Sequence, residues 1–182
     1  MLSALEARGF HGVGINELLV AAQAPKGVLY HHFPGGKSEL AVAAIEAAIS
    51  NLTARLDQAI ATRTEPVVAV RILMASAERR LERSGYSCGC ALATISLEST
   101  TEDTAIRAAL ADGFMAIRSR LETLLMSRGI PKDRAQRLSA LIVASYEGAL
   151  IQSRVAETPR FMRLITEALV DQVKAEQIRA DK

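Results

Sequence analysis

The strongest constraint on the fold is an apolar repeat with steps of three and four residues, which runs through most of the chain. Between residue 37 and about residue 63, the side chains that recur at these steps are Ile45, Ile49, Leu52, Leu56 and Ile60. This spacing places them on one face of an α-helix, whereas a half-buried strand would alternate with a period of two. No segment shows that alternation or the turn residues of a hairpin. The sequence therefore predicts an all-α fold.

Proline and glycine divide the rest of the repeat into separate helices. Pro66, Pro131 and Pro159 suit the first turn of a helix, where their missing N–H group has no helical partner. Gly85 and Gly129 follow apolar stripes and suit helix ends. A short apolar segment, from residue 88 to about residue 97, lies between two longer helices. Because aromatic residues make up only 4% of the chain, we expect a core of aliphatic side chains.

The first forty residues have a different composition. They contain eight of the 16 glycine and proline residues, so their helices must be short. This contrast predicts a small compact head over residues 1–40 and a larger helical body over residues 41–182.

Within the head, the pattern predicts two short helices separated by a tight turn. The first runs from Ile15 to Ala22, Gln23 and Ala24 form the turn, and the second runs from Pro25 to about His32. In such a helix-turn-helix the second helix can enter the major groove of DNA.

The residues that follow the turn offer the groups that DNA binding requires. Lys26 and His31 supply donors, Val28 can contact a thymine methyl group, and the Tyr30 hydroxyl suits a phosphate oxygen. The Pro-Gly-Gly-Lys segment that ends at Lys37 then leads into a helix. Backbone N–H groups at a helix start, together with a lysine, favour an anion such as a backbone phosphate.

The run KGVLYHHFPGGKSEL, which starts at Lys26, resembles the DNA-binding head of TetR-family regulators, in particular the subgroup typified by LmrA and YxaF. The resemblance also covers Gly9-Phe10 and the segment from Ile15 to Leu18, and a weaker similarity covers Gly89 to Glu98. It implies nine helices in each subunit, of which the first three contact DNA and the last two form a homodimer.

The resemblance assigns the DNA contacts residue by residue. It implies that Tyr30 and His32 contact phosphates, that Lys37 anchors the following helix on a phosphate, and that Asn16 helps to hold the DNA backbone. The residues that would face base edges are Lys26, Gly27 and Val28, and His31 is also predicted to face DNA. Two positions depart from the family pattern: Gln23 replaces the usual turn glycine, which predicts a right-handed or strained turn, and Gly14 replaces the usual helix cap.

The body offers candidates for a dimer interface and a ligand pocket. Gly148 lies in the middle of a predicted helix, where glycine costs about 1 kcal/mol relative to alanine, and close approach of a partner subunit would offset that cost. The predicted interface consists of Ser145, Gly148, Ala149, Leu164 and Ala168. The predicted pocket residues, for a small and mostly apolar effector, are Met74, Phe114, Ile117 and Tyr146. We expect this pocket between the helices that start at residues 37, 66, 88 and 103.

Charge and reactive residues limit the other function classes. The net charge of +2 does not by itself identify a DNA-binding protein. No histidine follows His32, so a nucleophile–histidine pair within the body is impossible, and we expect no enzyme activity. Cys88 and Cys90 offer at most two metal ligands, so we expect no metal site and no cofactor.

The sequence therefore predicts a regulator that binds double-stranded operator DNA, most simply a repressor that a small-molecule effector releases. The alternative is a helical dimer that binds ligands or proteins without binding DNA. No apolar run approaches the ~20 residues that would span a bilayer, and the N-terminus lacks the layout of a signal peptide. We therefore expect a cytoplasmic protein without membrane contact.

Overall fold

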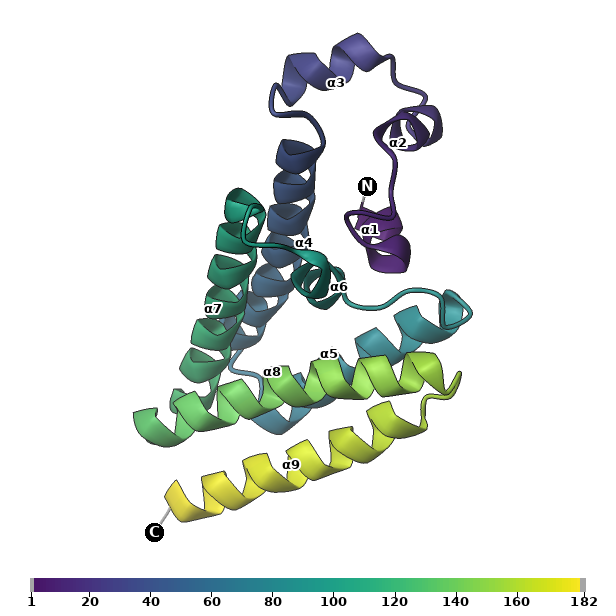
Figure 1. Cartoon of the computed structure of the whole chain (residues 1–182). Helices are drawn as coiled ribbons and strands as arrows, with labels where there is room; N and C mark the ends of the chain where they lie inside the picture. Colours follow the sequence, from purple (N-terminus) through teal and green to yellow (C-terminus); the bar gives the residue numbers. More distant parts are fainter. Residues whose placement is uncertain (1, 181–182) are drawn as a thin grey trace. The chain divides into compact units, whose positions relative to one another are not determined.

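The computed structural model describes residues 2–180, and its regular secondary structure is entirely α-helical (Figure 1). Within these residues it contains nine helices, so the predicted all-α class and helix number are confirmed. The helices are α1 (Leu2–Arg8), α2 (Ile15–Ala21), α3 (Lys26–His32), α4 (Gly36–Ala61), α5 (Pro66–Arg83), α6 (Ala91–Glu98), α7 (Thr104–Met126), α8 (Lys132–Val155) and α9 (Arg160–Ala180).

The helices form two compact units that do not coincide with a simple division of the sequence. The first unit contains the chain up to Ser50 together with Cys90–Phe114, and the second contains Asn51–Gly89 together with the chain from Met115 onward. Helices α4 and α7 each begin in the first unit and end in the second. The helix-turn-helix segment therefore shares a compact unit with α6 and with the first parts of α4 and α7.

Aliphatic side chains from several helices fill the core of the first unit. Helix α1 packs against α6, although the two are far apart in the sequence. The fully buried residues of this core include Leu5, Val13, Ala41, Ile45, Ile95 and Ile106. Near the start of α7, the backbone N–H and the hydroxyl of Thr100 donate to the Asp103 carboxylate at 2.8 and 3.0 Å. These bonds favour the charged carboxylate and lower the pKa of Asp103.

Where α1 and α6 meet, the carboxylate of Glu98 lies against the backbone of Gly9. Gly9 follows α1 with a φ of +71°, a conformation that disfavours any side chain. The Glu98 carboxylate lies directly over the Gly9 backbone and accepts the His11 backbone N–H at 3.0 Å. A Cβ atom on Gly9 would overlap that carboxylate. This position therefore requires glycine both for its backbone angle and for the approach of Glu98.

We expect Gly9→Ala to destabilise the protein by at least the ~1–2 kcal/mol that a left-handed conformation costs a residue with a Cβ atom. Displacement of Glu98 from the His11 N–H would add to this loss. Chemical denaturation of the variant and of wild type would measure the difference. Gly27→Ala is the control, because a Cβ atom there meets nothing within 4 Å. Equal stability of Gly9→Ala and wild type would contradict the expectation.

The second unit is built around α5, α8 and α9. Helices α8 and α9 run side by side along most of their length, and α5 packs against both (Figure 1). The apolar stripes predicted from the sequence supply its core: Met74, Leu81, Leu121, Ile142, Leu150, Val170 and Val173 are almost completely buried. The connection between α8 and α9 is held by the buried Ser153 hydroxyl, which accepts the Met162 backbone N–H at 3.1 Å.

Ion pairs at the surface also link α5 to α9. The Arg71 guanidinium donates to both Glu167 oxygens, at 2.6 and 2.9 Å, and these hydrogen bonds lower the pKa of Glu167. Arg163 donates to Glu78 at 2.8 Å. In each pair the arginine of one helix has a carboxylate partner on the other.

The helix boundaries differ slightly from those predicted. Pro66 is the first residue of α5, as expected, but Pro25, Pro131 and Pro159 each precede their helices by one residue. The Gln23 turn adopts the strained alternative, with a φ of +51°. Gly14 caps α2 without a side-chain hydrogen bond, as the sequence predicted.

Candidate nucleic-acid interface and ligand cavity

Helices α2 and α3 form the helix-turn-helix, and each of them buries one leucine. Leu18 of α2 and Leu29 of α3 are the buried residues of these helices. In the turn, the Ala24 N–H donates to the Leu19 carbonyl at 3.0 Å, and the left-handed Gln23 reverses the chain. This hydrogen bond ties the end of α2 to the residues that lead into α3.

The outward face of α3 follows from the position of Leu29. With about 100° between successive residues of a helix, Gly27 and His31 lie nearly opposite Leu29, and Val28 and Tyr30 lie on either side of them. Leu29 is 7% exposed, whereas Val28 and Tyr30 are 44% and 45% exposed. Helix α3 therefore presents a face with an open glycine at its centre and a hydroxyl and an imidazole beside it.

Other predicted DNA-binding residues surround this face. Asn16 and Lys26 line the same open hollow between α2 and α3. The Lys26 ammonium lies 6.0 Å from the centre of the Tyr30 ring, and the His31 and His32 rings pack edge to face at 5.0 Å. The structure thus brings seven of the eight predicted DNA-binding residues onto α3 or beside it.

The start of α4 differs from the predicted phosphate site. The Gly35 N–H donates to Glu39 Oε2 at 2.7 Å, and the Gly36 N–H donates to the Phe33 carbonyl at 2.8 Å. Both glycine donors are therefore already used, and a carboxylate stands where a phosphate was expected. The eighth predicted residue, Lys37, places its ammonium 4.6 Å from the centre of the Phe10 ring. The prediction that Gly35 and Gly36 form an anion site was wrong, because a glutamate one helical turn further on competes for it.

Gly36 has a different role in the structure. It is buried with a φ of +66°, and a Cβ atom there would lie 3.4 Å from Cε1 of Tyr30. Glycine at this position permits the sharp turn into α4 and the close approach of the Tyr30 ring.

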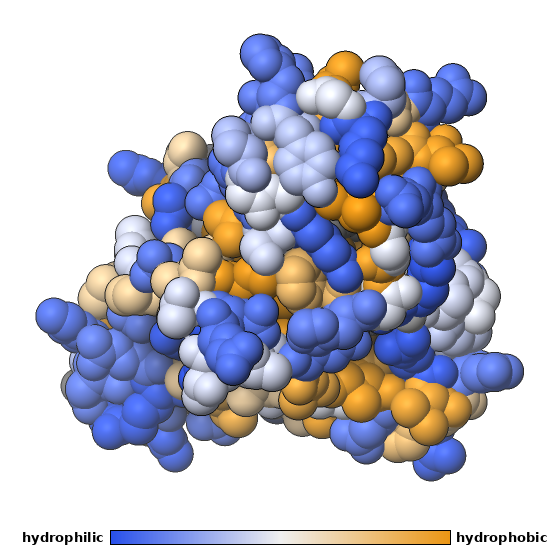
Figure 2. Space-filling view, turned by 45° about the horizontal axis from the view of Figure 1, so that its top comes forward, coloured by the Kyte–Doolittle hydropathy of each residue, from blue (hydrophilic) through white to orange (hydrophobic). Residues whose placement is uncertain are grey.

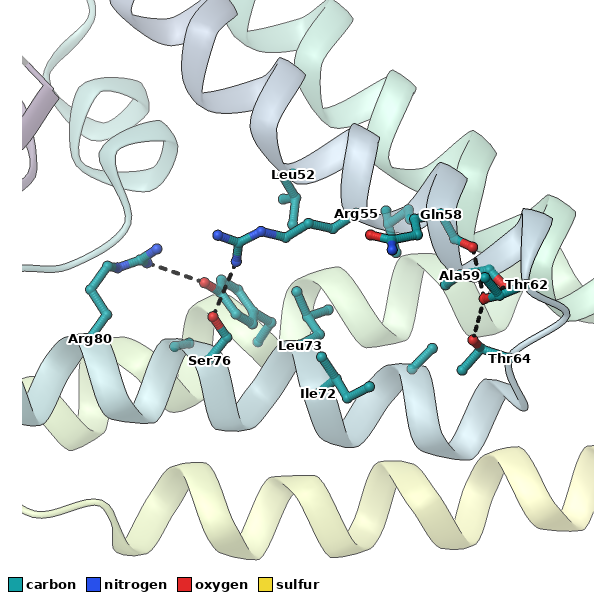
Figure 3. A pocket seen from close by; sticks show the side chains of 14 residues that line it. Leu52, Arg55, Gln58, Ala59, Thr62, Thr64, Ile72, Leu73, Ser76 and Arg80 are labelled. Carbon is teal, nitrogen blue, oxygen red and sulfur yellow. Dashed lines mark hydrogen bonds between the residues drawn. The ribbon is translucent and has the colours of Figure 1, made fainter.

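A cavity of about 350 Å³ lies within the second unit. Its walls come from the last part of α4, from α5, and from Tyr146 of α8 (Figure 3). The residues that line it are Leu52, Arg55, Leu56, Gln58, Ala59, Thr62, Thr64, Ala69, Ile72, Leu73, Ser76, Ala77, Arg80 and Tyr146. Its volume is at the lower end of the range for small-molecule pockets, ~300–1,000 Å³.

Of the four predicted pocket residues, Tyr146 lines this cavity and the others do not. Met74 and Ile117 are buried in the core, and Phe114 belongs to the first unit. The cavity lies beside α4 and α5, as expected, but α8 rather than α6 or α7 completes its lining. Sequence reasoning missed Arg55, Ser76 and Arg80, whose signal was a polar residue directly beside an apolar stripe.

Metal and membrane sites find no support in the part of the chain that the structure describes. No group of three or more His, Cys, Asp or Glu side chains lies close enough together to hold a metal ion. Cys88 and Cys90 are free thiols and half-buried. None of the described helices is both long and apolar enough to cross a membrane.

Family models match both parts of the chain. Residues 2–44 match the model of bacterial regulatory proteins of the tetR family, and residues 66–168 match the C-terminal domain of LmrA/YxaF-like transcriptional regulators. The second match alone covers more than half of the 182 residues. The chain belongs to the TetR family. The resemblance predicted from the head, including its LmrA/YxaF-like subgroup, is confirmed.

Individual relatives agree with this assignment. The TetR-family chain is 24% identical to the HTH-type transcriptional regulator LmrA of Bacillus subtilis over 93% of its own length and 90% of that protein. It is 30% identical to an uncharacterised HTH-type transcriptional regulator of Mycobacterium tuberculosis over 83% of its length and 78% of the relative. A crystal structure of a TetR regulatory protein from Rhodobacter sphaeroides superposes with a TM-score of 0.80, at 26% identity and 93% coverage of both chains.

This TetR-family chain is therefore a DNA-binding transcriptional regulator, and the alternative of a helical module without DNA binding is not favoured. Its family consists of transcriptional regulators rather than enzymes, and its members bind operator DNA and form dimers.

The predicted dimer residues of this regulator lie on α8 and α9. Leu164 is 56% exposed, Ala168 is exposed, and Ser145 and Gly148 are half-buried. Ala149, in contrast, is 1% exposed and packs inside its own subunit. Figure 2 shows one face of the molecule, on which hydrophobic side chains gather in patches between hydrophilic ones. The large apolar side chains that α8 and α9 expose are Leu141, Ile151, Val155, Leu164 and Ile178.

Proposed function

We propose that this regulator binds its operator as a homodimer and represses transcription until a small, mostly apolar effector releases it. The observation that carries the DNA-binding part is the outward face of α3, which is free of bulky side chains at Gly27 and has donors around it. A helix with these features can enter a major groove and approach base edges closely.

The proposed contacts divide into two kinds. Lys26, Gly27 and Val28 face base edges and contribute sequence preference. The Tyr30 hydroxyl, the two imidazoles that follow it and the Asn16 amide contact the DNA backbone and fix the register. Lys37 joins them when its ammonium leaves the Phe10 ring for a phosphate.

The homodimer is proposed to form through the exposed parts of α8 and α9. Two copies of each helix would make a four-helix interface, which buries the apolar side chains that these helices expose. A two-fold dimer of this kind presents two α3 helices about 34–36 Å apart, or a multiple of that distance, to match successive turns of DNA.

Release by the effector is proposed to act through α4. This helix begins directly after the helix-turn-helix, and its last turns line the cavity. An effector that binds one position of α4 more tightly than another shifts the population toward that position, by no more than the difference in affinity. The spacing of the two α3 helices then no longer matches the operator.

Salt dependence tests whether the Lys26 ammonium enters the DNA groove, where it lies close enough to the phosphates to release a counterion. The operator would first be located by footprinting the promoter regions beside the regulator's own gene. We expect Lys26→Ala to weaken binding and to reduce the slope of log K against log salt concentration by about 1, because one fewer counterion is released. Fluorescence anisotropy over a salt series would measure both quantities.

Arg79→Ala is the matched control, since it removes the same charge from an exposed position of α5 in the second unit, outside the proposed dimer helices α8 and α9. It should leave affinity and slope unchanged. An unchanged slope for Lys26→Ala, or the same reduction in both variants, would contradict the proposed position of α3.

A further inference from the structure

The cavity of the second unit has a charge pattern that a purely apolar effector does not explain. Its lining contains two arginines and no aspartate or glutamate. We propose that the effector carries one carboxylate group, which Arg55 and Arg80 bind, and an apolar body no longer than a medium-length acyl chain. This inference rests on the proposed role of the cavity as the effector site.

Arg55 has a neutral hydrogen-bond partner at the edge of the cavity. Its Nη1 donates to the Ser76 hydroxyl at 3.3 Å, a long bond to a neutral acceptor. Among the described residues Arg55 forms no ion pair. Arg55 therefore keeps most of its five donors and its full charge available beside the cavity.

Two other arginines of the second unit, Arg71 of α5 and Arg120 of α7, do have carboxylate partners. Arg71 of α5 is bound at both nitrogens by Glu167, and Asp57 of α4 lies 3.1 Å from Arg120. Arg55, in contrast, has a hydroxyl where these two arginines have a carboxylate. A carboxylate from a ligand would complete the two-pronged hydrogen bonding that a guanidinium favours.

The second guanidinium reaches the same end of the cavity. Arg80 Nη2 donates to the Tyr146 hydroxyl at 3.3 Å, and Figure 3 shows Arg80, Arg55 and Ser76 together at one end. Either hydroxyl can turn to donate to a bound anion, because a hydroxyl group is both donor and acceptor. One end of the cavity is therefore suited to a carboxylate.

The rest of the cavity is suited to hydrocarbon. The aliphatic side chains Leu52, Leu56, Ile72 and Leu73 also line it, and Figure 3 shows Ile72 and Leu73 between its two ends. At the opposite end, the Thr62 hydroxyl bonds to the Gln58 carbonyl and to the Thr64 hydroxyl, both at 2.9 Å, so these groups satisfy each other (Figure 3). A water molecule occupies about 30 Å³ in the liquid, so a cavity of 350 Å³ has room for about a dozen groups of that size. This volume limits the apolar body of the effector to a medium-length acyl chain.

Isothermal titration calorimetry of the full chain without DNA tests the inference with three probes of equal chain length: octanoate, 1-octanol and octylamine. At neutral pH we expect octanoate to bind at least ~10-fold more tightly than octanol, and octylamine to bind most weakly. We expect Arg55→Gln to weaken octanoate binding by a factor of ~10 and to leave octanol binding nearly unchanged, because only the anion loses its partner.

Two further variants keep the result interpretable. Arg79→Gln removes the same charge from α5 outside the cavity lining and should bind octanoate as wild type does. Arg55→Lys keeps the charge but not the planar donor pair, so it should give an intermediate loss even if Arg55→Gln folds poorly. Thermal melting would establish that each variant is folded.

The inference is overturned if octanol or octylamine binds as tightly as octanoate, if no probe binds, or if Arg55→Gln matches wild type. DNA is absent from these titrations, so they do not depend on operator binding. A gel shift of the unliganded protein tests the proposed repressor separately, and either result can fail while the other stands.

Discussion

Replacement of Gly27 by glutamate is expected to abolish operator binding and to leave the protein folded. A Cβ atom at Gly27 meets nothing within 4 Å, and the residue lies in the first turn of α3, where a carboxylate is favourable to the helix. On the proposed DNA-facing side, however, the same carboxylate would approach phosphates and base edges. Like-charge contacts at an interface cost several kcal/mol, so we expect affinity to fall by a factor of ~100 or more.

Fluorescence anisotropy with operator DNA at fixed salt would measure this loss, and circular dichroism would confirm the helical content. Ala47→Glu is the matched control, because it adds the same charge at an exposed position of α4 in the first unit. Gly27→Ala should give a much smaller loss, because a methyl group hinders the approach of α3 to base edges without adding a charge. If Gly27→Glu and Ala47→Glu bound equally well, α3 would not be the helix that enters the groove.

The fold could be predicted from the sequence because its two signals are local. Apolar residues at steps of three and four residues define a helix without knowledge of what covers it, and proline and glycine mark where helices begin and end. Pro25, Pro131 and Pro159 were misplaced by one residue, since proline is accepted both just before a helix and at its first position. The candidate DNA-facing residues of α3 came instead from their residue types and from the family resemblance, and the burial of Leu29 shows which face of that helix points outward.

Contacts between distant segments could not be predicted in this way. Nothing near Gly9 in the sequence indicates that Glu98, the last residue of α6, would lie over it and bind the His11 N–H. The first unit is therefore larger than the helix-turn-helix pattern suggested. Competition within a short segment was also missed: Gly35 and Gly36 have the pattern of an anion site, yet Glu39 and the Phe33 carbonyl take their N–H groups.

The cavity shows why pocket residues are harder to predict than core residues. An apolar stripe has the same pattern whether it packs against another helix or lines an empty space, so Met74 and Ile117 were indistinguishable from Leu73 and Ile72. The distinction depends on helix separation, which a single sequence does not contain. Arg55 and Arg80 are polar residues at the edge of such stripes, where a solvated position is the usual outcome.

Replacement of Gly148 by leucine is expected to strengthen α8 and to disrupt the dimer. Within its own subunit a Cβ atom at Gly148 meets nothing within 4 Å, so the small side chain is not required by the subunit's own packing. Leucine favours a helix by roughly 0.8 kcal/mol relative to glycine, and the isolated subunit should become slightly more stable. The absence of a side chain at Gly148 leaves room for a second subunit to approach α8 closely, as the proposed interface requires.

In the dimer, the leucine side chain would hold the two copies of α8 apart and separate the apolar residues around them, such as Ile151 and Val155. We expect the dimer dissociation constant to rise by a factor of ~100 or more, because overpacking a close helix contact costs several kcal/mol when it occurs twice across a two-fold axis. Analytical ultracentrifugation would measure this constant, and operator binding should weaken in parallel, since a monomer presents only one α3. Gly148→Ala should give a much smaller change. A Gly148→Leu variant that sediments as a dimer with wild-type affinity would place the subunit interface elsewhere on the protein.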